Sequence, residues 1–442
     1  MMKVLLIGNG AREHVIAETL KKNKETILYS YLKSKNPGII SLSEEFEVGN
    51  YNELEKIENY AKKIKPDFAF IGPEEPLNNR VVDLLQRIGI ESIGPTKSLA
   101  RLESSKSFTR HLLKKYKIKG NPEFEIIDKN NIDRAERFIK DLKLCVIKPD
   151  GLTGGKGVKV QGDHFTTKEE ALEYCNEVLQ EHQRVIVEEK LDGEEFSLQC
   201  LTDGKTVAAM PPVQDHKRAY VGDTGPNTGG MGSYSCENHL LPFLTKKDID
   251  EGLRITQKVA EAIHDETGQF YKGIMYAGLM ITKDGVKLLE YNARFGDPEA
   301  MNVLPLLETD LVELCTAIIH QSLHKIKISF QNKATVCKYI VPKGYPDNPV
   351  KNKKIEIENI PQDAKLYYGA VDKMNDGLYI TASRAIGCLG ISDSLVKAEK
   401  IAEKAANSIK GPVFHREDIG TRNLIDKRIM HIKKIHNLNQ KI

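Results

Sequence analysis

Apolar and polar residues follow one another along the chain in two spacings, which predict alternating strands and helices. Short apolar runs of strand type begin at Lys3, Phe68 and Ala334. Apolar residues three or four positions apart predict helices over four further segments, which are residues 11–24, 104–116, 311–324 and 394–409. This alternation indicates an α/β protein.

Two apolar runs with turn residues between them predict a buried hairpin over residues 273–281 and 286–289. The second run leads directly into Glu290, Asn292 and Arg294, which would share one face of a strand. Carboxylate and amide oxygens suit Mg²⁺, and an arginine can hold a carboxylate or a phosphoryl oxygen. The pattern indicates phosphoryl chemistry, although this motif in isolation is more often a solvated strand end.

A glycine-rich segment between two apolar runs predicts a phosphate-binding loop. Lys148 stands near the end of the first run. The loop itself contains Gly154, Gly155, Lys156 and Gly157. Glycines let backbone N–H groups approach phosphate oxygens, and lysine adds a compact positive charge. It is not a Walker loop, because Gly-Lys is followed by glycine and Val158 opens a strand. A purely structural hairpin is the alternative.

A charged, glycine-containing bend follows the apolar run 185–187. If this segment passes from one lobe to another, backbone groups of Glu188, Glu189 and Leu191 could contact an adenine ring. Glu195, where strand-forming residues resume, could then reach the ribose hydroxyls. An ordinary acidic turn is the alternative.

The first strand enters its helix through Gly8, Gly10 and Arg12, and a helix N-terminus with a nearby arginine suits a ribose 5′-phosphate. Glu13 stands where a dinucleotide fingerprint needs its third glycine, which argues against a nicotinamide cofactor. Glu74 follows the run 68–72 and could accept hydrogen bonds from ribose hydroxyls or a 1-amine. A proline-rich turn is the alternative there.

Several motifs occur together, in order, over nearly the whole chain. The most specific are Gln-Asp-His-Lys-Arg at 214–218, Gly-Pro-Asn-Thr-Gly-Gly-Met-Gly at 225–232 and Asn-Ala-Arg-Phe-Gly-Asp-Pro-Glu at 292–299. Through them the sequence resembles the ATP-grasp ligases and, among these, the phosphoribosylamine–glycine ligase (glycinamide ribonucleotide synthetase) family. The sequence departs from the family's common loop at Pro149 and Thr153. Residues 274–281 contain no carboxylate, so the source of any second metal ligand stays open.

The resemblance implies an ATP-grasp fold with a Rossmann-like N-terminal domain, a mobile lid and a C-terminal α/β domain. We expect residues 1–103 to form the first, 104–325 the ATP-grasp domain with its lid at about 121–191, and 326–442 the last. The implied reaction joins glycine to 5-phosphoribosylamine in purine biosynthesis. ATP is the co-substrate, Mg²⁺ or Mn²⁺ the metal, and glycyl phosphate the intermediate. A monomer or small homo-oligomer, and transient contact with neighbouring pathway enzymes, stay open.

The resemblance also assigns residues to these ligands. Asp215 would hold the glycine ammonium, Arg294 the glycine carboxylate or its acyl phosphate, and Lys156 would join them in catalysis. Lys106 and Lys148 would add positive charge at the phosphates, while Glu290 and Asn292 would hold the metal. The expected substrate-binding residues are Gly10, Arg12, Glu13, Glu74, Asp215, Lys217, Asn227, Thr228, Gly229, Gly230, Arg294, Gly296 and Asp297.

Composition narrows the class of protein further. The chain has 442 residues with 65 basic and 62 acidic side chains, and no basic patch with aromatic residues that would indicate nucleic-acid binding. Seven scattered cysteines predict reduced thiols, and no apolar stretch approaches about 18 residues, so we expect a cytoplasmic enzyme without a membrane span. An ATP-grasp ligase with another acid or amine, and a non-enzymatic nucleotide sensor, are the alternatives.

Overall fold

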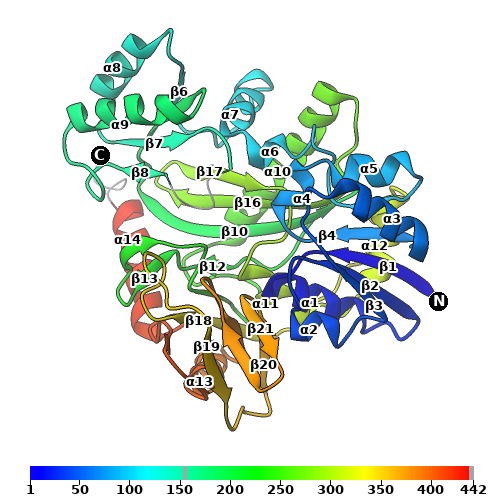
Figure 1. The fold of residues 1–442 in the computed structure, drawn as a ribbon. Helices are drawn as coiled ribbons and strands as arrows, with labels where there is room; N and C mark the ends of the chain where they lie inside the picture. Colours follow the sequence, from blue (N-terminus) through cyan, green and yellow to red (C-terminus); the bar gives the residue numbers. More distant parts are fainter. Residues whose placement is uncertain (153–156, 438–442) are drawn as a thin grey trace.

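The computed structural model describes residues 1–152 and 157–437 as a mixed α/β protein, which confirms the expected class. Figure 1 shows the N-terminal unit in blue beside a central sheet, the lid in cyan above that sheet, and the C-terminal unit in gold and orange below it. Among the described residues, no helix has the length and apolar character to cross a membrane.

The N-terminal unit is a parallel sheet in the order β3-β2-β1-β4-β5, with helices against it. Its elements are β1 Met2–Ile7, α1 Ala11–Leu20, β2 Thr26–Leu32, α2 Pro37–Ile40, β3 Glu45–Val48, α3 Leu54–Ile64, β4 Phe68–Ile71, α4 Glu74–Asn78, α5 Val81–Arg87 and β5 Ser92–Ile93. The carboxyl ends of β1 and β4 lie side by side, since Gly72 donates its N–H to Ile7. The segments after both strands therefore meet at one edge.

The predicted helices differ from the observed ones mainly at their ends, and the helix expected over 311–324 ends at Ile319. The segment 104–116 is broken at Ser105, whose extended backbone ends α6 (Arg101–Ser104) and whose hydroxyl caps α7 (Lys106–Lys115) by accepting from the Phe108 N–H. Helix α1 ends at Leu20, because the residues after it turn back into β2. Element ends depend on such caps, which hydrophobic spacing does not reveal.

The lid segment, defined as residues 121–191, folds as an antiparallel sheet in the order β6-β9-β7-β8 with two helices. Its elements are β6 Phe124–Ile127, α8 Ile132–Asp141, β7 Cys145–Pro149, β8 Lys159–Val160, α9 Lys168–Glu181 and β9 Val185–Glu189. Ile127, Ile139 and Ile147 belong to an apolar cluster that is separate from the main core. The segment thus has a small core of its own.

The central sheet has the order β11-β10-β16-β17, all antiparallel. This region contains β10 Gly193–Thr202, β11 Val207–Ala209, β12 Gln214–Asp215, β13 Arg218–Tyr220, β14 Thr224–Asn227, β15 Gly232–Ser235, α10 Lys246–Thr267, β16 Gly273–Thr282, β17 Gly285–Asn292, α11 Glu299–Val303, η1 Leu304–Leu306, α12 Leu311–Ile319 and η2 Leu323–Lys325. The predicted hairpin is present as β16 and β17, and β17 is the edge strand of this sheet.

A bulge interrupts that hairpin beside the predicted metal residues. Gly278 pairs with Glu290 and Leu279 pairs with Leu288, so Leu289 is the extra residue on β17. Arg110 donates to the Leu288 and Leu289 carbonyls, at 2.9 and 2.7 Å. A bulge changes the direction in which the next side chains point, and this one directly precedes Glu290.

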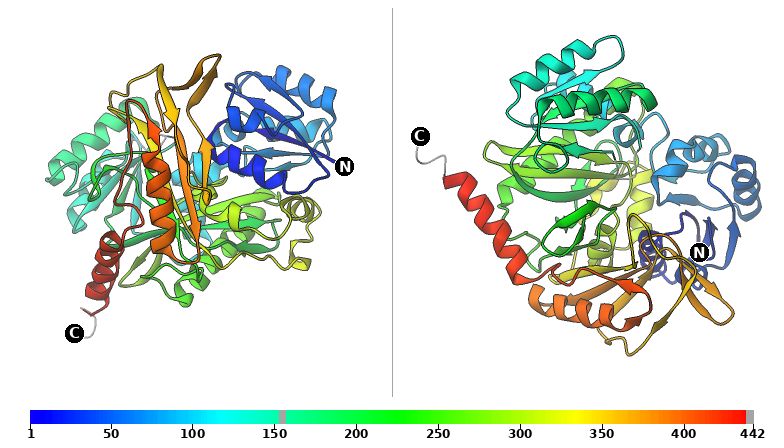
Figure 2. Two further views of the ribbon diagram at one scale, coloured as in Figure 1. Left: turned by 90° about the horizontal axis from the view of Figure 1, so that it is seen from below. Right: turned by 60° about the vertical axis from the view of Figure 1, so that its left-hand side comes forward.

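The C-terminal unit shares a sheet with the central region. The strand order of this sheet is β12-β15-β18-β23-β20, in which β12 and β15 come from the central region. Its elements are β18 Ala334–Pro342, β19 Lys353–Ile357, β20 Ala364–Tyr368, β21 Val371–Met374, β22 Gly377–Ile380, β23 Ile386–Ser392, α13 Leu395–Asn407, β24 Ile409–Lys410, β25 Val413–Phe414 and α14 Arg422–Asn437. Figure 2 shows α14, in red, running away from this unit along the side of the molecule.

Candidate active site

A cavity of about 1210 Å³ is lined by residues of the N-terminal unit, the lid, the central region and the C-terminal unit. Ligand pockets usually measure about 300 to 1,000 Å³, so this one has room for more than one small substrate. Most of the predicted site residues in the described part of the chain line it. Gly154, Gly155 and Lys156 lie outside the described residues.

Two cations and one carboxylate form an ion-pair cluster where the lid meets the central sheet, and a third cation, Lys106, lies near it. Arg110 Nε lies 2.6 Å from one oxygen of Glu188, and Lys148 Nζ lies 2.7 Å from the other. Lys106, the first residue of α7, donates to the Gly151 carbonyl at 2.8 Å. Burial raises the pKa of the Glu188 carboxyl, but Arg110 and Lys148 outweigh it and hold that pKa at about 2. The cluster therefore keeps a positive charge beside the lid loop.

The structure reduces the number of residues whose backbone could contact an adenine ring. Glu188 and Glu189 belong to β9, which pairs with β6 on one side and β7 on the other, so the ladder occupies much of their backbone. The Glu188 side chain is taken up by its ion pairs, so only its backbone is left for the expected contact, which stays a prediction. Leu191 comes after β9 and lines the cavity, and it is the better candidate among these residues.

Glu290 and Asn292 lie on one face of β17 and both line the cavity. Burial raises the pKa of Glu290, but the nearby cations Lys217, Lys106 and Lys148 outweigh it and lower that pKa. Among the described residues, no group of three or more His, Cys, Asp or Glu is arranged to hold a metal. An ionised carboxylate and an amide oxygen still suit Mg²⁺, which commonly takes its other ligands from water and phosphate.

Lys217 lies between two predicted ligand groups. Its Nζ is 3.3 Å from a Glu195 oxygen and 3.8 Å from a Glu290 oxygen. Glu195, the expected ribose contact, raises the pKa of Lys217 together with Glu290, against the effect of burial. Lys217 therefore stays charged and links the nucleotide side of the cavity to the metal residues.

Arg294 lies just beyond β17 between two carboxylates. Its Nε donates to Glu74 at 3.2 Å, and another guanidinium nitrogen lies 2.9 Å from a Glu103 oxygen. Burial raises the pKa of Glu74, but Arg294 and Arg12 hold it at about 2. Glu74, at the end of β4, and Arg12, at the start of α1, both line the cavity. Glu103, which sequence reasoning did not single out, is fully engaged in positioning Arg294 and the Ala293 N–H.

The predicted anion site at the start of α1 is only partly present. The Gly10 N–H donates to the Glu13 carboxylate, which also pairs with Arg12 Nε. Glu13 is 2% exposed and, like Gly10, does not line the cavity. Glu13 therefore caps its own helix, and its expected role as a substrate ligand stays a prediction. Arg12 lines the cavity, with its Nε paired to Glu13 and another guanidinium nitrogen donating to the Phe295 carbonyl at 3.1 Å.

The glycine-rich segment 225–232 folds over Asp215. Thr228 donates its N–H to the Lys217 carbonyl at 2.7 Å and accepts from the Gly230 N–H at 3.1 Å. Asn227, Thr228 and Gly229 line the cavity with Asp215, whereas Gly230 packs against the Asp215 carboxylate from behind.

A second carboxylate, Glu299, lies in the same part of the cavity. Tyr276 donates to it at 2.7 Å, and it lines the cavity with Asp215. Burial first, and then the Glu299 charge, raise the pKa of Asp215 well above its usual value. Two neighbouring carboxyls form a place where an ammonium group would be stabilised. Glu299 is the last residue of the motif 292–299, but nothing in the sequence around it indicated a role in the site.

Arg384 connects this region to the C-terminal unit. It donates to the Gly229 carbonyl at 2.6 Å, to the Asp297 carbonyl at 2.7 Å and to the Asp297 carboxylate at 3.0 Å. Gly296, beside Asp297, donates its N–H to Gln199 at 2.8 Å and lines the cavity. Sequence reasoning missed Arg384, because the motif match around it is loose. Only the fold brings it to the cavity.

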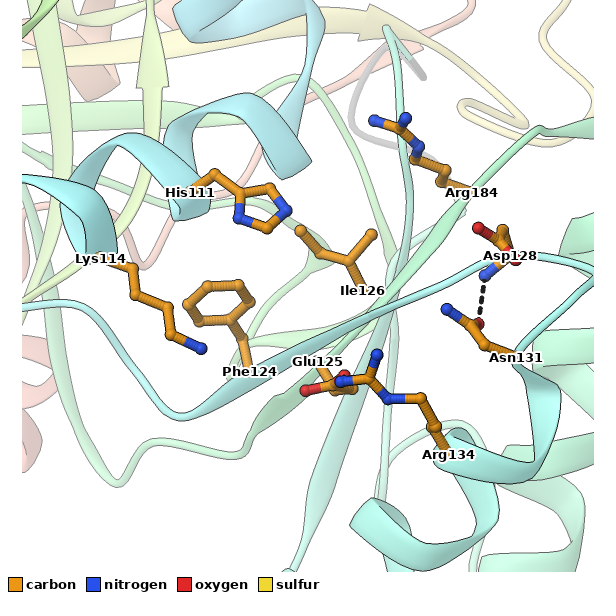
Figure 3. Close-up of a pocket in the computed structure, with 9 residues that line it drawn as sticks. All are labelled: His111, Lys114, Phe124, Glu125, Ile126, Asp128, Asn131, Arg134 and Arg184. Atoms are coloured by element: carbon orange, nitrogen blue, oxygen red, sulfur yellow. Dashed lines mark hydrogen bonds and ion pairs between the residues drawn. The ribbon is translucent and has the colours of Figure 1, made fainter.

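A smaller groove, of about 270 Å³, lies between α7 and the lid sheet and shares no lining residue with the large cavity. Figure 3 shows His111 and Lys114 on one side of it and Glu125 beside Arg134 on the other. Glu125 and Arg134 pair with each other, and Lys114 lies over the Phe124 ring. None of the predicted site residues lines this groove.

Comparison with protein families gives three consecutive matches. They are the phosphoribosylglycinamide synthetase N domain at residues 2–103, its ATP-grasp (A) domain at 104–300 and its C domain at 335–422. Curated proteins named phosphoribosylamine–glycine ligase are similar over almost the full length. That of Methanocaldococcus jannaschii is 48% identical over 98% of this chain and 100% of its own, and one from Methanococcus maripaludis is 49% identical over the same shares.

Solved structures agree with this match. The crystal structure of phosphoribosylamine–glycine ligase from Thermotoga maritima is 27% identical, covers 94% of this chain and 99% of its own, and superposes with a TM-score of 0.79. The biotin carboxylase domain of Hydrogenobacter thermophilus 2-oxoglutarate carboxylase shares the fold at 14% identity, with a TM-score of 0.71, 98% coverage of this chain and 94% of its own. The expected ATP-grasp fold is thereby confirmed.

Proposed function

The chain belongs to the phosphoribosylglycinamide synthetase family, and we propose that the large cavity is where its ligase reaction takes place. Members of this family are ATP-dependent ligases that join glycine to 5-phosphoribosylamine in purine biosynthesis. Membership excludes the two alternatives, a ligase for other substrates and a non-enzymatic sensor. The residues that would carry each step lie in separate parts of that cavity.

ATP would lie along the junction of the lid and the central sheet. Leu191 and Glu195 would contact the base and ribose, and Lys106 and Lys148 would neutralise the phosphates; all four line the cavity. Support comes from the cluster of cations there, which exceeds the one carboxylate that pairs with them. Phosphoryl transfer depends mainly on such positioning and charge neutralisation.

A divalent cation, Mg²⁺ or Mn²⁺, would be held by Glu290 and Asn292. Bound there, it would supply positive charge to the ATP phosphates. The fit rests on the ionised Glu290 carboxylate, and on an Asn292 side chain for which the described residues provide no hydrogen-bond partner. The nearby ammonium group of Lys217 keeps Glu290 charged.

Glycine would bind between Arg294 and the carboxyls of Asp215 and Glu299. Arg294 would hold the glycine carboxylate as it accepts the γ-phosphoryl group, and the two carboxyls would hold the ammonium. Both carboxyls have a raised pKa, so an incoming cation lowers their pKa and is itself stabilised.

5-Phosphoribosylamine would bind at the N-terminal unit, with Arg12 at its phosphate and Glu74 at its ribose hydroxyls or amine. The support is that both line the cavity and lie beside Arg294. The amine could then attack the acyl phosphate held by Arg294, with release of phosphate. Closure of the glycine-rich segments over this site would exclude water from that labile intermediate.

The observation that carries the proposal is the meeting of Lys148, Glu290, Arg294 and Asp215 in one cavity, although they come from distant segments of the chain. The test is ADP release with ATP, Mg²⁺, glycine and freshly generated 5-phosphoribosylamine, omitting each substrate in turn. Release should require both glycine and the amine. Release that ignores either would contradict the proposed placement of the substrates.

We predict that Glu290→Ala lowers turnover by about 100-fold or more, since a group that organises transition-state charge is lost. Asp284→Ala, in the exposed turn before β17, is the matched control and should keep activity. The measurement is the rate of ADP formation over a range of Mg²⁺ concentrations, with circular dichroism to check the fold. Full activity in Glu290→Ala would remove this residue from the metal site.

We infer further that the protein works in the cytoplasm on small molecules. The seven cysteines are buried and unpaired, which supports a reducing compartment. Neither nucleic acid nor membrane is needed for the reaction.

A further inference from the structure

Helix α14 leaves the C-terminal unit and packs on the central region instead. It contacts β10 and β16, and Figure 2 shows it lying along the outside of that region. Ile425, Ile432 and Ile435 form its apolar face and are buried in the main core. Nearly all of this helix lies beyond the residues that match the family's C domain. Its position is set by contacts with the central sheet.

A second stripe of α14 faces the large cavity. Lys427, Met430, His431 and Lys434 stand at positions i, i+3, i+4 and i+7, which share one side of a helix, and all four line the cavity. Met430 is 63% exposed, which is unusual for a large apolar side chain. The stripe gives the cavity a wall that is mainly basic.

Between the two stripes, α14 holds a buried carboxylate of β10. Glu194 has a side chain 6% exposed, and each of its oxygens meets α14. His431 Nδ1 lies 2.6 Å from one oxygen, and Arg428 Nε lies 3.3 Å from the other. His431 Nε2 also lies 3.1 Å from Asp192. The Glu194 carboxylate is therefore held by one hydrogen bond with His431 and one ion pair with Arg428.

Glu194 stands in the segment where the chain passes from the lid to the central sheet. It lies between Leu191 and Glu195, both of which line the cavity, and Glu195 pairs with Met280 of β16 across the sheet. His436 Nε2 lies 3.4 Å from the Thr282 carbonyl at the end of the same strand. Helix α14 therefore covers the end of the cavity assigned above to the base and ribose of ATP.

We propose that α14 is part of the nucleotide site, and that Arg428 and His431 are positioning residues which act through Glu194. By fixing Glu194 and Asp192 they hold residues 190–195 in the conformation that receives the nucleotide. Lys427 and Lys434 close the cavity on that side. This inference rests on the placement of ATP proposed above, and on contacts made by residues outside the sequence motifs of the family.

The test compares His431→Leu with His431→Gln and with Lys433→Ala. His431 is the better target, because Arg428 also pairs with Asp223 in the glycine-rich region. Lys433 is an exposed neighbour on α14 that does not line the cavity, which makes it the matched control. Binding of ADP to the full chain is measured by titration calorimetry in the absence of glycine and sugar phosphate.

We expect His431→Leu to weaken ADP binding about tenfold, the size of one lost charge-assisted hydrogen bond. Glutamine can still donate to Glu194, so His431→Gln should recover part of the affinity, and Lys433→Ala should bind as the unaltered chain does. The KM for ATP should rise with the dissociation constant, and the KM for glycine should change by less than about twofold.

Equal affinity for ADP in the unaltered chain and His431→Leu would overturn the inference about α14. A parallel rise in the KM for ATP and for glycine, with a lower unfolding temperature, would also overturn it, because it would make α14 a general support of the fold. Failure of the unaltered chain to bind ADP would instead contradict the placement of the nucleotide itself.

Discussion

At the scale of single residues, the site depends on backbone conformations as much as on charged side chains. Gly230 has φ +111°, and a Cβ there would lie 2.6 Å from an Asp215 oxygen and 2.7 Å from Pro298. Gly222, in the adjacent turn, has φ +78° but no atom within 4 Å of an added Cβ. Both glycines therefore need a positive φ, but only at Gly230 would a side chain collide with Asp215.

We predict that Gly230→Ala and Gly222→Ala each lower the free energy of unfolding by about 1 to 2 kcal/mol, the cost of forcing alanine into a positive φ. Only Gly230→Ala should raise the KM for glycine, because its methyl group displaces the Asp215 carboxylate. Denaturant unfolding and steady-state kinetics give the two quantities. Similar glycine KM values in the two variants would show that Asp215 does not need this support.

At the scale of elements, the β9 strand, α7 and the β17 bulge are joined by one buried cluster. Glu188 on β9 pairs with Arg110 on α7 and Lys148 on β7, and Arg110 also donates to the bulged Leu289. The Glu188 and Arg110 side chains are 4% and 3% exposed. Breaking one member of such a cluster leaves a buried charge without a partner.

We predict that this cluster makes the free energy of unfolding depend on pH. The pKa of Glu188 is about 2 in the folded chain and near 4.5 when unfolded, so its contribution is complete above about pH 4.5 and is lost as the pH falls towards 2. The shift corresponds to about 3 kcal/mol. Denaturant unfolding at several pH values measures it.

Glu188→Gln provides the comparison for that prediction. The variant should be less stable than the unaltered chain at pH 7, and the difference should shrink below pH 4.5 as the carboxyl of the unaltered chain takes up a proton. A difference that stays constant down to pH 3 would mean that the cluster does not hold the pKa of Glu188 low.

At the scale of the whole molecule, the C-terminal unit is continuous with the central region. Strands β12 and β15, from residues before 236, form one sheet with β18 and β23, and Arg384 reaches back to the cavity. The expected boundary near residue 326 therefore crosses a shared sheet. We propose that the N-terminal unit, the central region and the C-terminal unit fold as one cooperative unit, separate from the lid.

We predict that a chain ending at residue 325 loses its cooperative thermal transition, because β15 would expose an unpaired edge and a buried face. A chain ending at Thr421 keeps β18 and β23 and lacks only α14, so it should retain a cooperative transition. Circular dichroism during heating distinguishes the two. A cooperative transition in the shorter chain would show that the units fold independently.

The sequence by itself determined the fold class, the hairpin that presents Glu290 and Asn292, and the identity of the principal charged residues, because hydrophobic spacing and local motifs are properties of short segments. The sequence did not reveal that Glu13 caps its own helix or that the Glu188 side chain pairs with Arg110. Which partner a carboxylate binds depends on which groups the folded chain brings close to it.

Only the tertiary structure brought Glu103, Glu299, Arg384 and α14 to the cavity. Their partners are distant in the chain, and no periodic pattern records such contacts. Sheet pairing and burial decide which of many similar polar side chains meet, and that choice is made when the whole chain packs.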